Sequence, residues 1–524
     1  MKIAEGKNVR LGIFDIETYL ELFDIGIYDP DDDCWIEFEI SKYRNDLYKL
    51  VKYYESNPFD YWVSFNGIGF DHQVLQYILD KYQDWYDLDG LGICKVISDF
   101  SSKIIEDGRY DIPPPYREYQ FPVKCIDLFK IHHMDNKAKR TSLKWVEFML
   151  NMDVEEMPIH HRRQGLTEDE IQEVKDYRKH DVIATYKFLK LTLGDVDLPE
   201  LKDYKGKNKL QDRFDVMKET GMQCLNWSDV KIGEEWNKLD YKIREGITDE
   251  TVLFNRKIKQ PYGQPFKKFF PSTMSFQTDL FKDFVNKLGE EKVRMNRKGK
   301  PKQEYQLTVG KTTYTIAKGG LHSTEKHRTI IPPQGYNYDD IDVGSQYPNS
   351  IVKLNIYAPH LKPSMMELFK EKISNRFKFK DRATELKNLG RDEEARPYSS
   401  VQEMLKLCLN GGYYGKLGQE GSFLQYPEGL LRVCIGNQIE ILMLIEMMEM
   451  AGFQVLSGNT DGITVLYPSD KKVQFLAICS EWEKKVGNHT MGKLEHTPFK
   501  SVWQESINHY LAKKTDGKIK KKFF

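Results

Sequence analysis

The sequence has few of the features that would place a protein in a membrane or outside the cell. No run of about 18 apolar residues, the length needed to cross a bilayer, occurs in the chain. The N-terminus leads directly into strand-like sequence, without the apolar core of a signal peptide. We therefore expect a cytoplasmic protein that has no membrane partner.

Paired cysteines and an excess of charge are absent as well. The seven cysteines are scattered and form no CxxC pair, which argues against a zinc or iron–sulfur site and for a reducing compartment. The 78 basic and 79 acidic residues give a net charge of −1, which does not by itself indicate a nucleic-acid binder. Because catalytic carboxylates can cancel a basic groove in the sum, this charge does not exclude one either.

Internal repeats and low-complexity tracts are also absent, and the length of 524 residues predicts three or four domains. Apolar strands are expected at 9–20 and 61–66. The segment from Thr167 to Leu191 predicts a strong helix, because Thr167 and Glu170 form a capping box and apolar residues recur at helical spacing.

The pattern changes further along the chain. A polar, lysine-rich stretch at 195–215 predicts a domain boundary, and 292–302 predicts a basic loop, most simply a solvated hairpin tip. The second half predicts, in order, a strand from Tyr338 to Val343, a helix capped by Ser400 and Glu403, a helix from Asn437 to Met450, and two strands at Val455 to Ser457 and Ile463 to Leu466.

Four acidic residues of the first half have the placement that a metal site needs. Asp15 and Glu17 are two apart on an apolar strand, so both side chains leave the same face, where they repel each other unless a cation neutralises them. Asp71 opens a helix after a glycine-containing turn, and Asp181 lies beside the apolar face of its helix, one turn after Tyr177. Together they predict a site for two Mg²⁺ or Mn²⁺ ions that cleaves phosphodiesters, with Tyr177 orienting the attacking water. The alternative is four unrelated acids on strand ends and helix faces.

A second set of residues suits nucleotidyl transfer. Asp342 ends one strand and Asp461 lies in a hairpin turn, an arrangement that brings two distant carboxylates within reach of one pair of metal ions. The helix-borne cations and donors suited to a triphosphate are Arg376, Lys380, Lys406 and Asn410. Arg376 and Lys380 share a helix face, which is equally typical of a solvated surface. Tyr347, just after the Asp342 loop, is placed to stack under a sugar.

Seven motifs in a fixed order carry a resemblance to one family. They are FDIET (14–18), NGIGFD (66–71), YRKHD (177–181), KGGLHS (318–323), DVGSQYP (342–348), KLCLNGGYYGK (406–416) and NTDG (459–462). They resemble the three 3′–5′ exonuclease motifs, the YxGG segment and the polymerase motifs A, B and C of family B DNA polymerases of the compact phage type. The resemblance runs from about residue 10 to residue 520.

The resemblance implies an α/β plus α+β multidomain fold: a ribonuclease-H-like exonuclease domain followed by a polymerase palm with helical fingers. The implied domains are the exonuclease at 1–200, a linker and the first part of the palm with motif A at 201–352, the fingers at 353–415, and the second part of the palm with the start of a thumb at 416–524. The implied proofreading residues are Asp15, Glu17, Asp71, Tyr177 and Asp181. The implied polymerase metal ligands are Asp342, Asp461 and the Val343 carbonyl, with Tyr347 excluding ribonucleotides.

The chain departs from the family pattern at several positions. Asn459 replaces the first aspartate of motif C, Ala317 the tyrosine of YxGG, and Asn508 the lysine of the family's KxY motif. Motif B has one residue too many before its YG pair, so either Tyr413 or Tyr414 could stack on the nascent base; we assign Tyr414. The sequence also ends where a thumb would begin, so nearly all of the thumb is expected to be missing.

We therefore expect a template-directed DNA polymerase with proofreading, which copies a phage-like genome in the host cytoplasm. Its expected partners are primer–template DNA and deoxynucleoside triphosphates, with two Mg²⁺ or Mn²⁺ ions per active site. The alternatives are an exonuclease whose thumbless polymerase half only holds DNA, and an inactive accessory subunit. The lysine-rich segment Lys513–Lys522 is a frayed terminus, a grip on duplex DNA, or a lead into a thumb that a separate thumb-bearing or processivity polypeptide supplies.

Overall fold

The structure is a computed structural model of the chain. It describes residues 1–134, 141–194, 208–254, 257–294, 304–316, 319–324, 327–487 and 492–522. Most of the expected basic loop at 292–302, much of the lysine-rich stretch at 195–215, and Ala317 and Lys318 lie outside these residues. The chain divides into two compact units: the first is Met1–Ile232 with Leu386–Met404, and the second is Gly233–Glu385 with Leu405–Phe524. None of the described helices is long and apolar enough to cross a membrane.

The first unit is built on a five-stranded mixed sheet with the strand order β5-β4-β3-β6-β7. The strands are β3 (Leu11–Thr18), β4 (Leu22–Asp29), β5 (Cys34–Ser41), β6 (Tyr61–Ser64) and β7 (Cys125–Asp127). The β3–β4 and β4–β5 pairs are antiparallel, whereas β3–β6 and β6–β7 are parallel. The strands expected at 9–20 and 61–66 are thus confirmed within slightly narrower bounds.

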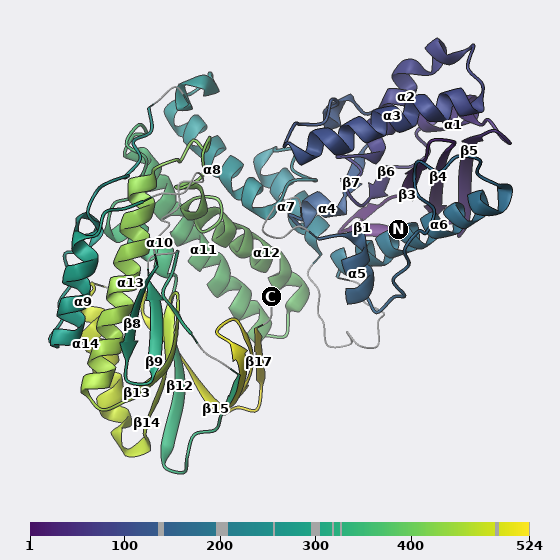
Figure 1. The fold of residues 1–524 in the computed structure, drawn as a ribbon. Helices are drawn as coiled ribbons and strands as arrows, with labels where there is room; N and C mark the ends of the chain where they lie inside the picture. Colours follow the sequence, from purple (N-terminus) through teal and green to yellow (C-terminus); the bar gives the residue numbers. More distant parts are fainter. Residues whose placement is uncertain are drawn as a thin grey trace. The chain divides into compact units, whose positions relative to one another are not determined.

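Helices cover both faces of this sheet (Figure 1). On one face lie α1 (Leu47–Ser56), α2 (Asp71–Lys81) and α3 (Gly90–Arg109), and on the other lies α6 (Glu168–Thr192). Side chains alternate along a strand, so neighbouring residues of β3 enter different apolar cores. Phe14 packs in the cluster that contains Val74 of α2, whereas Ile13 packs in the cluster that contains Val182 of α6. The central strand β3 is therefore held from both sides.

The predicted start of α6 is confirmed by its capping box. The Glu170 N–H donates to the Thr167 hydroxyl at 3.2 Å, and the Thr167 N–H donates to the Glu170 carboxylate at 2.9 Å. The remaining elements of this unit include β1 (Lys2–Ala4), β2 (Lys7–Asn8), α4 (Leu128–Ile131), α5 (Leu143–Met149) and α7 (Lys209–Thr220). α8 (Asp229–Glu245) runs from the first unit into the second.

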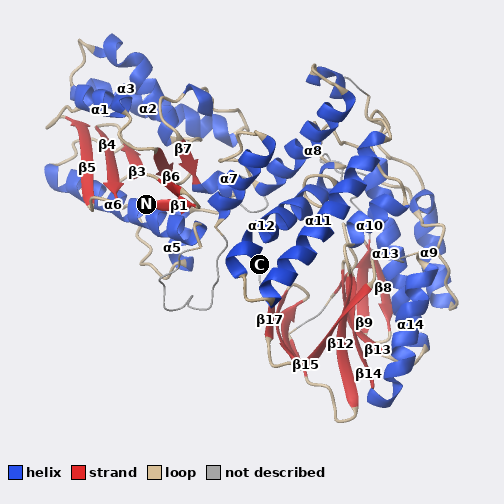
Figure 2. Cartoon of the chain, turned by 180° about the vertical axis from the view of Figure 1, so that it is seen from behind, coloured by secondary structure: helices blue, strands red, loops and turns tan. Residues whose placement is uncertain are grey.

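The second unit is built on a larger sheet in which β12 (Tyr336–Val343) is central and antiparallel to both neighbours, β14 and β15. The strand order is β17-β16-β15-β12-β14-β13-β10-β9-β8, and β11 pairs with β15. The other strands are β8 (Tyr305–Val309), β9 (Thr312–Ile316), β10 (His322–Ser323), β11 (Arg328–Ile330), β13 (Gln454–Asn459), β14 (Gly462–Pro468), β15 (Leu494–Ser506), β16 (His509–Lys514) and β17 (Ile519–Lys522). Figure 2 shows these strands in red.

One apolar core lies between this sheet and three helices, α9 (Asp279–Glu290), α13 (Pro427–Met450) and α14 (Lys472–Lys485). α13 is buried along almost its whole length, and it begins at Pro427 rather than at the expected Asn437, because proline suits the first turn of a helix. The expected strand from Tyr338 and the hairpin around Asp461 are both present.

The helices α10 (Gln346–Lys353), α11 (Ser364–Asn388) and α12 (Asp392–Leu409) follow β12 along the chain. The prediction that Ser400 and Glu403 cap a helix is wrong. Ser400 lies inside α12, and its hydroxyl donates to the Asp212 carboxylate instead of accepting from its own helix. A partner 188 residues away satisfies this side chain, so the local capping pattern was misleading.

The reading of the lysine-rich end as a frayed terminus is also wrong for the described residues. β16 and β17 form a hairpin, and β16 pairs with β15 from Phe499 to Ser506. The described residues up to Lys522 therefore belong to the same sheet as β12, because the long strand β15 pairs with β12 through its first residues and with β16 through the rest.

Candidate active sites

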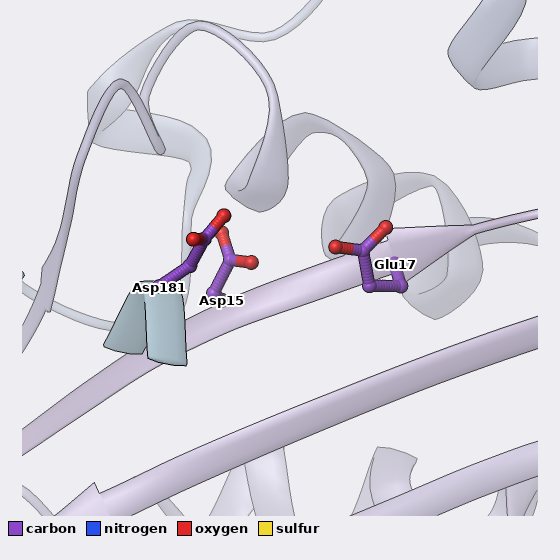
Figure 3. A group of neighbouring side chains, drawn as sticks. All are labelled: Asp15, Glu17 and Asp181. Carbon is purple, nitrogen blue, oxygen red and sulfur yellow. The ribbon is translucent and has the colours of Figure 1, made fainter. Parts of the chain in front are cut away.

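The first carboxylate centre lies at the end of β3. Asp15 and Glu17 leave the same face of the strand, and Asp181 reaches them from α6. Oxygens of these three carboxylates all lie within 4.8 Å of one another. Figure 3 shows Asp15 and Glu17 rising from β3, with the Asp181 carboxylate next to that of Asp15. This all-oxygen set fits Mg²⁺ or Mn²⁺, which prefer carboxylate ligands.

Asp71 joins the centre as the first residue of α2. Its carboxylate accepts the Ile16 N–H at 3.2 Å, which fixes it against β3 between the two carboxylates of that strand. The preceding NGIGFD turn is held by the buried Asp127, which accepts the N–H groups of Asn66 and Ile68 at 3.0 Å each. All four acidic residues predicted from the first three motifs are thus gathered at one place.

Burial raises the pKa of every carboxyl group in this centre, and the neighbouring carboxylates add to the effect. The pKa of Glu17 rises to about 8, that of Asp71 to about 7 and that of Asp181 to about 6, while that of Asp15 is raised well above its usual value. Backbone N–H groups oppose the rise at Asp71, and Lys144 opposes it at Asp181. A buried set of this kind is costly as four anions and gains stability from a bound cation.

Lys144 is a member of this centre that the sequence reasoning missed. Its Nζ lies 2.7 Å from Asp181 Oδ1, 3.1 Å from Glu147 Oε1 and 4.3 Å from the centre of the Tyr177 ring. Burial and Asp181 raise the pKa of Tyr177 to about 12, so its hydroxyl keeps its proton and can donate a hydrogen bond. Asp181 lies 37 residues beyond Lys144, so no local pattern pointed to the lysine.

The carboxylates line a cavity of about 480 Å³. Aromatic and apolar side chains complete its wall, among them Tyr19, Phe65 and Phe70, together with a segment at 157–161 that includes His160 and His161. The Leu20 N–H donates to the His161 carbonyl at 2.9 Å, which ties this segment to the end of β3. The sequence reasoning did not single out the segment.

A buried ion pair holds α6 in place beneath the cavity. Arg178, which follows Tyr177, is fully buried and donates to Asp24 at 2.5 Å and to Glu37 at 2.6 Å. Gly26 leaves room for it, since a Cβ there would lie 1.1 Å from an Arg178 nitrogen. Arg178 therefore fixes the turn of α6 that presents Tyr177 and Asp181.

The second carboxylate centre is set by the register between β12 and β14. Asp342 pairs with Gly462, so the adjacent Asp461 in the β13–β14 turn lies beside Asp342. The Val343 N–H donates to the Asp461 carbonyl at 2.7 Å, and Thr460 takes the left-handed conformation with φ of 56° that the turn requires. Burial, and then the charge of Asp342, raises the pKa of Asp461. The role of the Val343 carbonyl as a ligand stays a prediction.

Residues next to this centre include several of the predicted nucleotide ligands. The rings of Tyr347 and Tyr414 stack with centroids 4.1 Å apart, whereas Tyr413 is fully buried and donates its hydroxyl to the Ile356 carbonyl. Of the two tyrosines that could be the stacking residue of motif B, Tyr414 is therefore the one that packs against Tyr347. Arg376 donates to the Ser345 hydroxyl at 3.2 Å, just beyond Asp342.

The other predicted nucleotide ligands lie on the long helices. Lys380 is exposed on α11, one turn after Arg376, and Lys406 is exposed on α12. Asn410 follows α12, and its amide donates to the Lys406 carbonyl at 3.0 Å. Contact of these three side chains with a triphosphate stays a prediction.

No family model and no curated protein sequence matches this chain. Among solved structures it is similar to the family B DNA polymerase from the hyperthermophilic archaeon Pyrobaculum calidifontis, with a TM-score of 0.48 and 16% sequence identity. The alignment covers 99% of this chain and 60% of the archaeal protein. The chain thus spans about three fifths of that polymerase's length.

Proposed function

We propose that the chain is a template-directed DNA polymerase with a 3′–5′ proofreading exonuclease. The observation that carries this proposal is the sorting of its acidic motifs into two carboxylate centres, one in each compact unit. The order of the motifs and their resemblance to family B polymerases support it further. Copying of a phage-like genome is part of the same proposal.

The first centre would act as the exonuclease. Asp15, Glu17, Asp71 and Asp181 would hold two Mg²⁺ or Mn²⁺ ions, which in such sites activate a water and stabilise the leaving oxygen of a phosphodiester. Tyr177, whose hydroxyl keeps its proton, would orient the attacking water, and Lys144 would hold Asp181 in place. The aromatic wall of the cavity gives the bases of a DNA 3′ end a surface to stack on.

The second centre would join deoxynucleotides to a primer 3′ end. Asp342 and Asp461 are adjacent oxygen donors and suit the same ions. Arg376, Lys380, Lys406 and Asn410 would bind the triphosphate, while Tyr347 would stand under its sugar and exclude a 2′-hydroxyl. Tyr414, stacked on Tyr347, would face the nascent base pair.

A nuclease whose second unit only holds DNA is the rival function. It is favoured by one observation: in the part of the chain that the structure describes, a cluster of three carboxylates close enough to share a metal is found at Asp15, Glu17 and Asp181. The second centre offers Asp342 and Asp461, with Asn459 where the family has another aspartate.

Two variants assayed on one primer–template separate these functions. Asp461→Ala is expected to slow primer extension by at least about three orders of magnitude and to leave end degradation intact, because it removes a metal ligand from one centre only. Asp15→Ala combined with Glu17→Ala is expected to do the reverse. Wild-type protein that degrades DNA but never extends a primer would establish the rival function, and loss of both activities in each variant would contradict two separate centres.

A further inference from the structure

The C-terminal hairpin places a lysine on the second carboxylate centre. Lys520 of β17 lies with its Nζ 2.7 Å from Asp340 Oδ2 and 3.6 Å from Asp342 Oδ2. Asp340 and Asp342 are two apart on β12, so both carboxylates leave the same face of the strand. Lys520 therefore reaches the side of the sheet that carries the predicted polymerase ligand.

The hairpin fixes the direction in which Lys520 points. Lys520 pairs with Ala512 across the β16–β17 ladder, and its ammonium lies 5.9 Å from the centre of the Phe499 ring of β15. Its side chain is 32% exposed, so one side contacts protein and the other faces solvent. The next residue, Lys521, is exposed and leaves the opposite face of the strand.

Asp340 is the anchor of this lysine. It is buried, with 6% of its surface exposed, whereas the side chain of Asp342 is 42% exposed. An ammonium paired with a buried carboxylate stays where the fold puts it. Lys520 also hydrogen-bonds the Tyr510 side chain and faces Asp342, and its solvent-exposed side is open to a further acceptor. Asp342 is the more accessible of the two acids, so a substrate bound there comes within reach of Lys520.

Arg376 and Lys520 thus lie on either side of Asp342 along the chain path of β12, and Lys522, two residues after Lys520 on the same face of β17, is a further cation that acts on Asp340 and Asp461. Arg376 contacts Ser345, which follows Asp342 beyond the end of the strand, while Lys520 contacts Asp340, which precedes it. In phosphoryl transfer the attacking hydroxyl and the leaving group lie on opposite sides of the reacting phosphorus. If Arg376 serves the triphosphate, Lys520 is on the side of the DNA 3′ end.

We propose that Lys520 binds a backbone phosphate at the 3′ end of the primer strand, held in place by Asp340. This inference rests on the proposed polymerase function, because that function places the primer end at Asp342. It gives the lysine-rich end of the chain a definite role: β17 supplies a phosphate ligand to the centre built on β12 and β14. Lysine suits this role because its ammonium can pair with a phosphate and a carboxylate at once.

The test measures binding of primer–template DNA as a function of salt for the full chain and its variants. Lys520→Met is expected to weaken binding about tenfold at low salt, and to lower the slope of log affinity against log salt by about 0.9, the contribution of one phosphate contact. Lys521→Met, on the other face of the same strand, is the matched control and is expected to bind as the wild type does. Lys520→Arg is expected to restore most of the slope, because it keeps the charge.

A purely structural role for Lys520 predicts a different outcome. Removing the lysine leaves the buried Asp340 unpaired, which could distort the sheet without any contact to DNA. In the double variant Lys520→Met with Asp340→Asn both charges are gone. Recovery of wild-type affinity and slope in the double variant would overturn the inference, whereas a slope that stays about 0.9 lower supports it.

The same measurements distinguish a failure of this inference from a failure of the proposed function. The proposed function is tested by primer extension with the wild-type protein, and that measurement is independent of the salt dependence of DNA binding. If the chain binds DNA through Lys520 but never extends a primer, the proposed polymerase function is refuted, whereas the contact between Lys520 and a DNA phosphate stands. A polymerase whose KM for the deoxynucleotide rises in Lys520→Met, with the slope for DNA unchanged, would place Lys520 on the triphosphate and refute the primer-side assignment.

Discussion

Gly462 is the position at which the second centre is most sensitive to a small change. A Cβ added there would lie 2.2 Å from Asp342 Oδ1 and 2.6 Å from the Ile341 carbonyl oxygen. Ordinary contacts of a Cβ begin at 3.4 Å, so the Asp342 carboxylate would have to move by about 1.2 Å. The backbone of β12 cannot shift to relieve the clash with the Ile341 carbonyl, because β12 is paired on both sides, with β14 and with β15.

We therefore expect Gly462→Ala to cut primer extension by about 100-fold, the effect of a displacement of about 1 Å at a reacting group. The crowding should also lower the free energy of unfolding of the second unit by about 1–3 kcal/mol. End degradation should stay within about twofold of the wild type, because its residues belong to the other unit.

The assay is single-turnover extension of a labelled primer by one nucleotide, with end degradation measured on the same preparation. Gly436→Ala is the matched control, because a Cβ at Gly436 in α13 meets nothing within 4 Å. This control should keep full activity and gain up to about 1 kcal/mol of stability, since alanine favours a helix. Extension by Gly462→Ala within threefold of the control would refute the assignment of Asp342 as a reacting-centre ligand.

Three further outcomes are expected. Because the folded-state pKa values of Asp181, Asp71 and Glu17 are raised to about 6, 7 and 8, the folded metal-free protein holds protons that the unfolded chain has already lost. Its stability should therefore fall as pH rises from about 4 to about 8, and the rise in Tm on adding Mn²⁺ should be larger at pH 8 than at pH 6; an equal rise at both would contradict these pKa values. Tyr347→Ala should raise incorporation of ribonucleotides relative to deoxynucleotides in competition assays, and equal use of both sugars by the wild type would rule out this role. Asn459→Ala should extend primers far better than Asp461→Ala, since the Asn459 amide donates to Asn508 at 3.2 Å and is not needed as a ligand; equal losses would show that both residues are.

Where a feature depends on neighbours in the chain, the sequence was a good guide. The capping box of α6 and the turn that carries Asp461 join residues at most four apart, and both are present as expected. The spacing of Asp15 and Glu17 likewise fixes their common face, since side chains alternate along a strand. The prediction of a helix start at Ser400 was wrong, because the Ser400 hydroxyl donates a hydrogen bond to Asp212, which is 188 residues away in the chain.

The members of the two centres that the sequence did not predict are those whose partners lie far away. Lys144 is part of the first centre through Asp181, and Lys520 of the second through Asp340, which is 180 residues away. A lysine looks the same in a sequence whether it faces water or a buried carboxylate. Only the folded chain brings the two charges together, so these contacts could not be read from local patterns.

The sequence by itself determined which residues are the candidates for the proposed chemistry and the order in which they occur, because motif spacing and strand alternation are local properties. The tertiary structure decided which of them meet. It placed α6 against β4 and β5 through the buried Arg178, it set Asp461 beside Asp342 through the register of β12 and β14, and it folded the lysine-rich segment up to Lys522 into the sheet. Each of these depends on pairing between segments distant in the chain, where burial and hydrogen bonding across the fold decide the outcome.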